Sequence, residues 1–179
     1  MPTEPIIDLS AIDLNARVMS RDDIALINAH RGVMAMLDAV VWLNDELSQG
    51  VAIKHVRDDE FWVAGHIPGR PLMPGVLMVE TAAQLASLIY YKRTGIEFFA
   101  GFTRIENVAF RGQVVPGDDF YLLCREVKFS LKRFVTDIQG IVNGQIVFEG
   151  CISGMVFPNL GRVVKGRLVE SNASVNATR

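Results

Sequence analysis

One stretch of the sequence carries a histidine and a carboxylic acid in a setting that suits proton transfer. His66 is one of only three histidines and begins a loop rich in glycine and proline. Glu80 is the single acid in the apolar run that follows, over about residues 74–93. Histidine moves protons readily near neutral pH, and burial raises the pKa of a carboxyl group into a usable range. The two residues are therefore a candidate acid–base pair.

Gln84 is the natural partner of Glu80 on the predicted helix. Residues four apart are neighbours on one helical face, so the Gln84 amide can donate a hydrogen bond to the carboxyl group and orient it. Purely structural roles stay open, because Glu80 could satisfy a buried partner and His66 could bond a nearby carbonyl. His30 and His55 have less support, since one ends a predicted helix and the other lies in a predicted strand.

The loop that carries His66 is predicted to be rigid. Pro68, Pro71 and Pro74 fix the backbone at three points, and each restrains the residue before it. Pro74 suits the start of a helix, and Gly75 allows another backbone or a ligand to approach closely. We therefore expect the loop to hold His66 in a defined place.

The apolar run after the loop is predicted to be a core helix and not a membrane span. It meets Lys92 and Arg93, with Gly95 as the expected C-cap, and so is shorter than the roughly 20 apolar residues of a span. Glu80 and Gln84 at its middle would also be costly in lipid. A helix that is apolar all round needs cover on more than one side, and a partner subunit is a natural source of it.

Strand patterns fill most of the remaining chain. Strands are predicted over about residues 36–46, 51–58, 96–110, 119–131, 134–142 and 145–157. Asn143-Gly144 is typical of a two-residue hairpin turn. Ser20 and Asp23 form a capping-box pattern, which predicts a short helix over about residues 21–30. The fold class is α+β, with one apolar helix against an antiparallel sheet of five or six strands.

The chain of 179 residues fits one domain with short extensions. We expect an N-terminal extension over residues 1–18, which drapes over the surface. The domain itself covers residues 19–158, and a C-terminal tail follows over residues 159–179, where the pattern is lost.

Composition and motifs exclude several classes of function. The net charge of −2 gives no basic footprint for nucleic acid. The three histidines lack metal-ligand spacing, and Cys124 and Cys151 are 27 apart (151 − 124), so no metal is expected. Glycine-rich nucleotide motifs and the serine-hydrolase elbow are absent, so we expect no cofactor. Residues 1–18 have no basic segment before an apolar block, which predicts a cytoplasmic protein without a signal peptide.

The central stretch resembles a known family. Gly65–Leu77, followed by Glu80 and by Ala83-Gln84, is similar to the signature of the 3-hydroxyacyl-[acyl-carrier-protein] dehydratases of bacterial fatty-acid synthesis, the FabZ type. The match includes the separation of 14 (80 − 66) between the histidine and the acid, and Phe99-Ala100-Gly101 follows in the right order. The resemblance spans about residues 22–157. It implies a hotdog fold, in which the sheet wraps around the long helix.

The resemblance also implies a reaction and an assembly. A (3R)-hydroxyacyl thioester of acyl-carrier protein, or of coenzyme A, loses water reversibly and becomes a trans-2-enoyl thioester. His66 would take the proton next to the thioester carbonyl, Glu80 would protonate the departing hydroxyl, and Gln84 would orient Glu80. A homodimer is implied, often as three dimers in a hexamer, with His66 of one subunit facing Glu80 of the other.

The substrate-binding residues that follow from the resemblance lie at the helix start and just beyond the helix. The N–H of Gly75 would hydrogen-bond the thioester oxygen as charge develops on it, with Val76 beside it. Phe98 and Phe99 would form walls of an acyl tunnel.

Departures from the family pattern leave two alternatives open. His30-Arg31 fits the family's early segment, but residues 32–37 lack its Pro-Phe pair and Ala39 stands in place of an arginine. A hotdog thioesterase would share the fold and the thioester, although it would not need the proline-rich loop with its histidine. A non-catalytic subunit that binds acyl thioesters or carrier protein is the third hypothesis.

Overall fold

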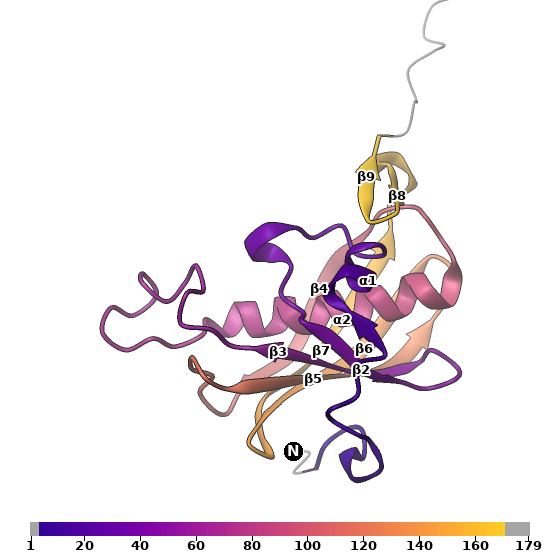
Figure 1. The fold of residues 1–179 in the computed structure, drawn as a ribbon. Helices are drawn as coiled ribbons and strands as arrows, with labels where there is room; N and C mark the ends of the chain where they lie inside the picture. Colours follow the sequence, from indigo (N-terminus) through magenta and orange to yellow (C-terminus); the bar gives the residue numbers. More distant parts are fainter. Residues whose placement is uncertain (1–3, 171–179) are drawn as a thin grey trace, which may run out of the picture.

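The computed structural model describes residues 4–170, in which an antiparallel sheet curls around one long helix (Figure 1). Its seven strands lie in the order β1-β2-β3-β5-β6-β7-β4, and all neighbouring pairs are antiparallel. The strands are β1 (Met19–Ser20), β2 (Ala39–Leu43), β3 (Gln49–His55), β4 (Ala100–Phe110), β5 (Asp119–Phe129), β6 (Arg133–Val142) and β7 (Gln145–Val156). The helix that the sheet surrounds is α2 (Gly75–Thr94).

The predicted strands and turns are observed with small shifts of their ends. The predicted hairpin before the helix consists of β2 and β3. Asn143 and Gly144 have φ angles of 49° and 74°, which places the β6–β7 connection in the left-handed region that two-residue hairpin turns require. The strand expected from residue 96 begins only at Ala100, because residues 96–99 leave the main sheet. The predicted α+β class is confirmed.

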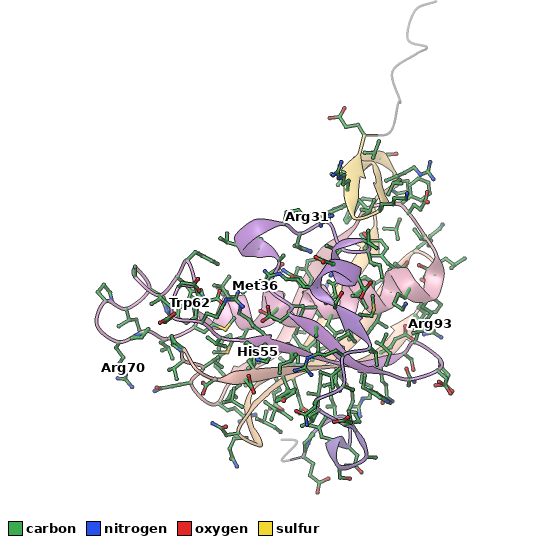
Figure 2. All side chains as sticks on the ribbon, in the orientation of Figure 1. Arg31, Met36, His55, Trp62, Arg70 and Arg93 are labelled. Carbon is green, nitrogen blue, oxygen red and sulfur yellow. The ribbon has the colours of Figure 1, made fainter. Side chains whose placement is uncertain are left out.

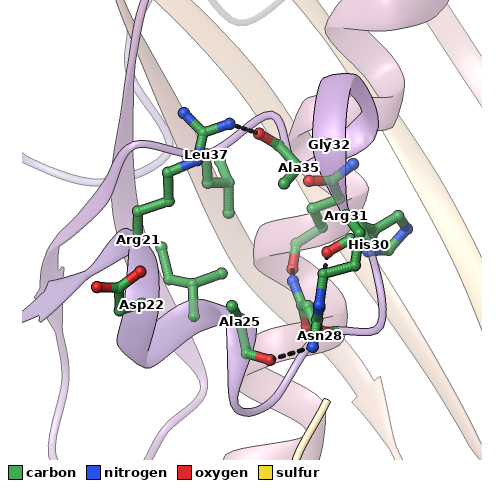
Figure 3. Close-up of a pocket in the computed structure, with 11 residues that line it drawn as sticks. Arg21, Asp22, Ala25, Asn28, His30, Arg31, Gly32, Ala35 and Leu37 are labelled. Atoms are coloured by element: carbon green, nitrogen blue, oxygen red, sulfur yellow. Dashed lines mark hydrogen bonds between the residues drawn. The ribbon is translucent and has the colours of Figure 1, made fainter. Parts of the chain in front are cut away.

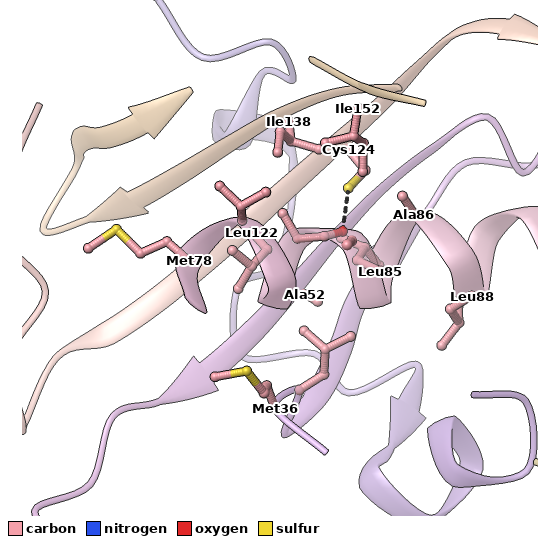
Figure 4. Packing of buried hydrophobic residues seen from close by; sticks show 14 of the residues in the cluster. Met36, Ala52, Met78, Leu85, Ala86, Leu88, Leu122, Cys124, Ile138 and Ile152 are labelled. Atoms are coloured by element: carbon pink, nitrogen blue, oxygen red, sulfur yellow. Dashed lines mark hydrogen bonds between the residues drawn. The ribbon is translucent and has the colours of Figure 1, made fainter. Parts of the chain in front are cut away.

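Helix α2 ends as predicted and packs against the sheet on its apolar side. Gly95 adopts φ 62° and donates its N–H to the carbonyl of Tyr91. Cys124 of β5 lies against the helix, and its thiol is 3.3 Å from the carbonyl of Ala82 (Figure 4). Burial raises the pKa of the Cys124 thiol, so this residue serves as a small core side chain.

No helix in the part of the chain that the structure describes is long and apolar enough to cross a membrane.

The second side of α2 is covered in part by the same chain. Helix α1 (Arg21–Ala25) and a 3₁₀ turn (Gly32–Met34) lead residues 24–37 across it, and Met36 and Leu37 are buried against α2. The helix expected over residues 21–30 therefore ends at Ala25. The segment that follows is hydrogen-bonded to α2 and does not continue the helix: the side chain of Asn28 donates to the backbone carbonyl of Gln84 at 2.8 Å. Tertiary contacts override the local preference here.

The N-terminal extension covers the opposite face of the sheet. The apolar side chains of residues 6–14 pack on Val41, Val51, Ile53 and Leu123, which form a second buried cluster. This segment therefore shields the outer face of the sheet from water.

The expectation of a tail without regular structure is wrong for residues 159–170. β8 (Arg162–Val164) and β9 (Arg167–Val169) form a separate hairpin, which lies above α1 in Figure 1. Strands of three residues are too short to show a hydrophobic period in the sequence. The remainder of the predicted tail, 171–179, lies outside the described residues, and the domain division at 18/19 and 158/159 stays a prediction.

A buried ion pair joins the end of β3 to the loop that precedes α2. Lys54 Nζ lies 2.5 Å from Glu60 Oε1, and their side chains are only 2% and 6% exposed. We expect Glu60→Gln to lower the free energy of unfolding by about 3 kcal/mol, because the Lys54 charge loses its counter-charge. The double variant Lys54→Met/Glu60→Leu should cost less, because it leaves no unpaired charge. Urea unfolding measures both.

Asp59→Asn is the matched control for this prediction. Asp59 is next in sequence and pairs with Arg57 at 3.6 Å, but its side chain is 79% exposed. Loss of the Asp59 charge should leave the urea midpoint of unfolding unchanged within error. Equal effects of the two single substitutions would contradict the prediction.

Candidate active site

His66 lies on the exposed loop between β3 and α2, and among residues 4–170 only one of its ring nitrogens has a hydrogen-bond partner. Its Nδ1 is 2.7 Å from the backbone carbonyl of Leu72. Because a carbonyl only accepts, Nδ1 carries the hydrogen, and Nε2 of the neutral ring keeps its lone pair. Nδ1 therefore makes the bond to a backbone carbonyl that the purely structural interpretation of His66 expected. This bond leaves the lone pair of Nε2 unused.

A backbone hydrogen bond fixes this loop at its C-terminal end, just before α2. Met73 is buried, and its N–H donates to the carbonyl of Val114 at 2.8 Å. Just after His66 the chain makes a turn, in which the N–H of Arg70 donates to the carbonyl of Ile67 at 2.9 Å. Arg70 lies at the far end of the loop, away from the body of the molecule (Figure 2). These contacts support the prediction of an ordered loop.

Glu80 lies on α2, and Gln84 orients it as predicted. The Gln84 amide donates to Glu80 Oε1 and to the backbone carbonyl of Met34, both at 2.8 Å. The amide oxygen accepts the N–H of Met36 at 3.0 Å. Both ends of this buried amide are therefore bonded, so its nitrogen can only point toward Glu80.

His30 is a partner of Glu80 that the sequence analysis ranked too low. Its Nε2 lies 3.3 Å from Glu80 Oε1. The two residues are fifty positions apart, so no helical or strand spacing relates them. The fit of His30-Arg31 to the early family segment was the one available signal.

The expectation of a raised pKa for Glu80 is wrong for the single chain. Burial of the carboxyl group raises the pKa of Glu80, but hydrogen bonds from His30 and Gln84, together with the charge of His30, lower it by more. The net pKa lies below the ordinary value. The sequence showed the apolar neighbours that desolvate the carboxylate but not the second donor, which comes from a distant segment.

Glu80, Gln84 and His30 lie on the wall of a cavity of about 170 Å³. Its other walls are small or aromatic: Ala83, Ser87, Phe99, Ala100, Gly101, Phe102 and Phe134. Phe99 is thus beside the carboxylate, as expected of an acyl-binding wall. Phe98 does not line this cavity, and its side chain faces outward, 40% exposed.

Gly75 and Val76 begin α2 with free backbone donors. Within residues 4–170 their N–H groups donate no hydrogen bond, and the helix has no side-chain cap. The ring of Phe110 lies 2.7 Å from where a Cβ of residue 75 would be, so a larger residue would require that ring to shift. Free N–H groups at a helix start attract developing negative charge.

The single chain does not join His66 to Glu80. Among the described residues no hydrogen bond or ion pair links them; His66 bonds Leu72, and Glu80 bonds Gln84 and His30. The same part of the chain has no group of three or more His, Cys, Asp or Glu side chains that could hold a metal ion.

Comparison with known sequences gives one family. A family model described as FabA-like domain matches residues 28–151. A protein of Sinorhizobium fredii named 3-hydroxyacyl-[acyl-carrier-protein] dehydratase FabZ is 35% identical over 130 residues, which covers 71% of this chain and 82% of that protein. A protein of the same name from Lawsonia intracellularis is 34% identical over 131 residues, or 69% and 83% of the two chains.

Solved structures share the fold at low identity. In the dehydratase heterocomplex ApeI:P from Xenorhabdus doucetiae, one chain matches with a TM-score of 0.64 at 13% identity, over 75% of this chain and 90% of that one. A homologue of HP0420 from Helicobacter felis matches with a TM-score of 0.56 at 13% identity, over 74% and 87%. These matches confirm the hotdog fold that the resemblance implied.

The lowered pKa of Glu80 predicts how stability depends on pH. An acid whose pKa is lower in the folded state stabilises the fold above its unfolded pKa, here about 4.5, and this stabilisation is lost as pH falls through the folded value. The free energy of unfolding of the wild type should therefore fall more than that of Glu80→Gln between about pH 5 and pH 3. Urea unfolding at several pH values measures this difference in slope.

Asp45→Asn is the control for the pH series. It removes an exposed carboxylate that makes no hydrogen bond or ion pair among residues 4–170, so its unfolding curve should follow the wild type. If the free energy of unfolding fell more steeply with decreasing pH for Glu80→Gln than for the wild type, folding would raise the pKa of Glu80.

Proposed function

Because the chain belongs to the family of FabA-like domains, we propose that it is a (3R)-hydroxyacyl-[acyl-carrier-protein] dehydratase, a hydro-lyase of fatty-acid biosynthesis. It removes water reversibly from a 3-hydroxyacyl thioester and forms a trans-2-enoyl thioester. The observation that carries this proposal is the Glu80 carboxylate, held by two donors at the wall of a largely apolar cavity. Relatives named as FabZ dehydratases supply the reaction.

Each proton movement has a residue suited to it. Nε2 of His66 takes the proton from the carbon next to the thioester carbonyl, and the electron pair forms the new double bond as the hydroxyl departs. The hydroxyl takes a proton from Glu80 and leaves as water. The N–H groups of Gly75 and Val76 stabilise the negative charge that gathers on the thioester oxygen.

Glu80 must hold a proton to act as the acid, although its pKa is low in the single chain. Substrate and a second subunit would exclude water from the cavity, and this added desolvation raises the pKa of a carboxyl group. The acyl chain would lie along Phe99 in the cavity, with Phe98 at its outer edge. The reaction breaks one C–H and one C–O bond with no net oxidation or reduction, and its proton transfers are assigned to His66 and Glu80, so it requires no cofactor.

A homodimer explains why His66 and Glu80 do not meet in one chain. β4 is an edge strand of the sheet, with backbone groups free to pair with another strand. Phe102, Ile105 and Phe110 on β4 are exposed, which is unusual for large apolar side chains on a free edge. We propose that two copies pair along β4, so that His66 of one chain faces Glu80 of its partner; three such dimers would give the hexamer.

Acyl-carrier-protein thioesters are the proposed substrates, with coenzyme A thioesters as the second choice. The cytoplasmic location that the sequence predicts stays a prediction.

Dehydratase activity can be measured directly in both directions. The enoyl absorbance should change when the protein is mixed with a short 3-hydroxyacyl thioester or with the matching enoyl thioester. His66→Ala and Glu80→Gln should each lower kcat by about 10²-fold or more, because each removes a proton-transfer group. His55→Ala removes an exposed histidine bonded to Asp119 and should keep the wild-type rate.

Two other outcomes would replace the proposal. Release of free thiol without enoyl interconversion would indicate a thioesterase. Binding to acyl-carrier protein with neither reaction would indicate a non-catalytic subunit.

A mixing experiment tests the shared site. If His66 and Glu80 come from different chains, a hybrid dimer of His66→Ala and Glu80→Gln contains one intact site. Equal mixing and re-equilibration should then restore about a quarter of the wild-type activity, since half of the dimers are hybrids with one of two sites intact. Each variant mixed with itself is the control. No recovery, with subunit exchange verified by mass spectrometry of tagged chains, would place both residues in one chain.

A further inference from the structure

Arg31 links three segments of the chain by hydrogen bonds to four backbone carbonyls. One terminal nitrogen, Nη1, donates to Asn28 at 2.8 Å and to His30 at 2.7 Å. The other, Nη2, donates to Ala25 at 2.7 Å and to Gly166 at 2.6 Å. Figure 3 shows Arg31 between Ala25, Asn28 and His30. The planar guanidinium fork can bond several acceptors at once, and a lysine could not reproduce this geometry.

Gly166 places the C-terminal hairpin (β8–β9) in direct contact with this link. It is buried in the turn between the two strands, at φ +67°. A Cβ there would lie 1.8 Å from the carbonyl oxygen of Ala25 and 2.6 Å from Arg31 Nη2, so no other residue fits without moving the turn. The contact depends on the absence of a side chain.

The other end of the hairpin is attached to the second wall of the Glu80 cavity. Phe99 donates its N–H to the carbonyl of Gly161 at 3.0 Å, and Phe98 and Arg162 form an isolated β-bridge. The hairpin therefore touches two of the segments that contribute cavity walls, residues 28–31 with His30 and residues 97–99 with Phe99. It lies beyond residues 28–151, which the family model matches.

We propose that the C-terminal hairpin is a positioning element of the active site, which acts through Arg31 on His30 and through His30 on Glu80. The proposal rests on the proposed function, in which Glu80 is the proton donor. His30 is then a positioning residue for Glu80, and the hairpin is a positioning element outside residues 28–151, which the family model matches.

The surroundings of His30 explain why its backbone must be held. Nε2 lies 3.3 Å from Glu80 Oε1, while the buried Nδ1 has no hydrogen-bond partner within residues 4–170. No second bond therefore orients the ring, so its place follows from the backbone that Arg31 fixes. Beside Glu80 and Arg31, the charged groups near it are Arg21 and Asp22 of α1, across a cavity of about 250 Å³ (Figure 3).

Gly166→Ala tests the proposal, because the added methyl group must push the turn away from Ala25 and Arg31. Gly144→Ala is the matched control: it has a similar φ of +74°, but no atom lies within 4 Å of its would-be Cβ. Both variants carry the same backbone strain, and only the first breaks the contact. Arg31→Lys is the second variant, since it keeps the charge and loses the fork.

The first readout is the titration of the Glu80 carboxyl carbon by NMR, assigned with Glu80→Gln. Gly166→Ala and Arg31→Lys should raise the apparent pKa of Glu80, because its His30 donor is no longer held, and Gly144→Ala should titrate like the wild type. The second readout is kinetic: kcat should fall about tenfold in the two variants with little change in KM.

The two readouts separate this proposal from the proposed function. Wild-type titration and wild-type kcat in both Gly166→Ala and Arg31→Lys would overturn the positioning role while leaving the dehydratase intact. Shifted titration in a protein without dehydratase activity would keep the coupling from hairpin to Glu80 and refute the proposed function. Circular dichroism of each variant confirms that the fold is retained.

Discussion

The buried amide of Gln84 is the interaction on which the site depends. Its nitrogen bonds Glu80 and the Met34 carbonyl, and its oxygen bonds the N–H of Met36. A buried polar group without partners is costly, so the amide ties α2 to the segment that crosses it. That tie holds the segment just after His30 against α2. One side chain in the middle of an apolar helix thus determines both the orientation of the acid and the path of a distant loop.

Close contacts between glycine and aromatic rings shape the cavity around this network. A Cβ at residue 154 of β7 would lie 2.2 Å from the ring of Phe134, so the glycine lets that ring lie flat over the strand. Phe134 in turn lines the cavity and packs against Tyr90 of α2, with ring centroids 4.7 Å apart. The dense packing of protein interiors leaves little freedom to change one of these residues alone. The sheet therefore contributes walls to the site as well as support for the helix.

One chain holds the proposed acid, Glu80, and the proposed base, His66, in different surroundings. Glu80 is partly buried and bonded to two side chains, whereas His66 is exposed on a loop that extends from the body of the molecule (Figure 1). The free N–H groups of Gly75 and Val76 lie between these environments in sequence, at the start of α2. Within residues 4–170 the outer edge of β4 has no strand partner, and in the proposed dimer a second copy would pair there and complete the arrangement. The division of the site between chains would make catalysis depend on assembly.

The sequence by itself determined the central helix, the positions of the main strands along the chain and the Glu80–Gln84 pair. These features are local, because helical period, strand alternation and the turn at Asn143-Gly144 involve neighbours along the chain. Only the tertiary structure decided the direction in which the pKa of Glu80 is shifted, since His30, which lowers it, is fifty residues away. It likewise decided the conformation of residues 159–170, which form a hairpin of short strands without a sequence period and place Gly166 against Arg31. Both features depend on contacts between residues far apart in the chain, and the spacing of residues in the sequence does not predict such contacts.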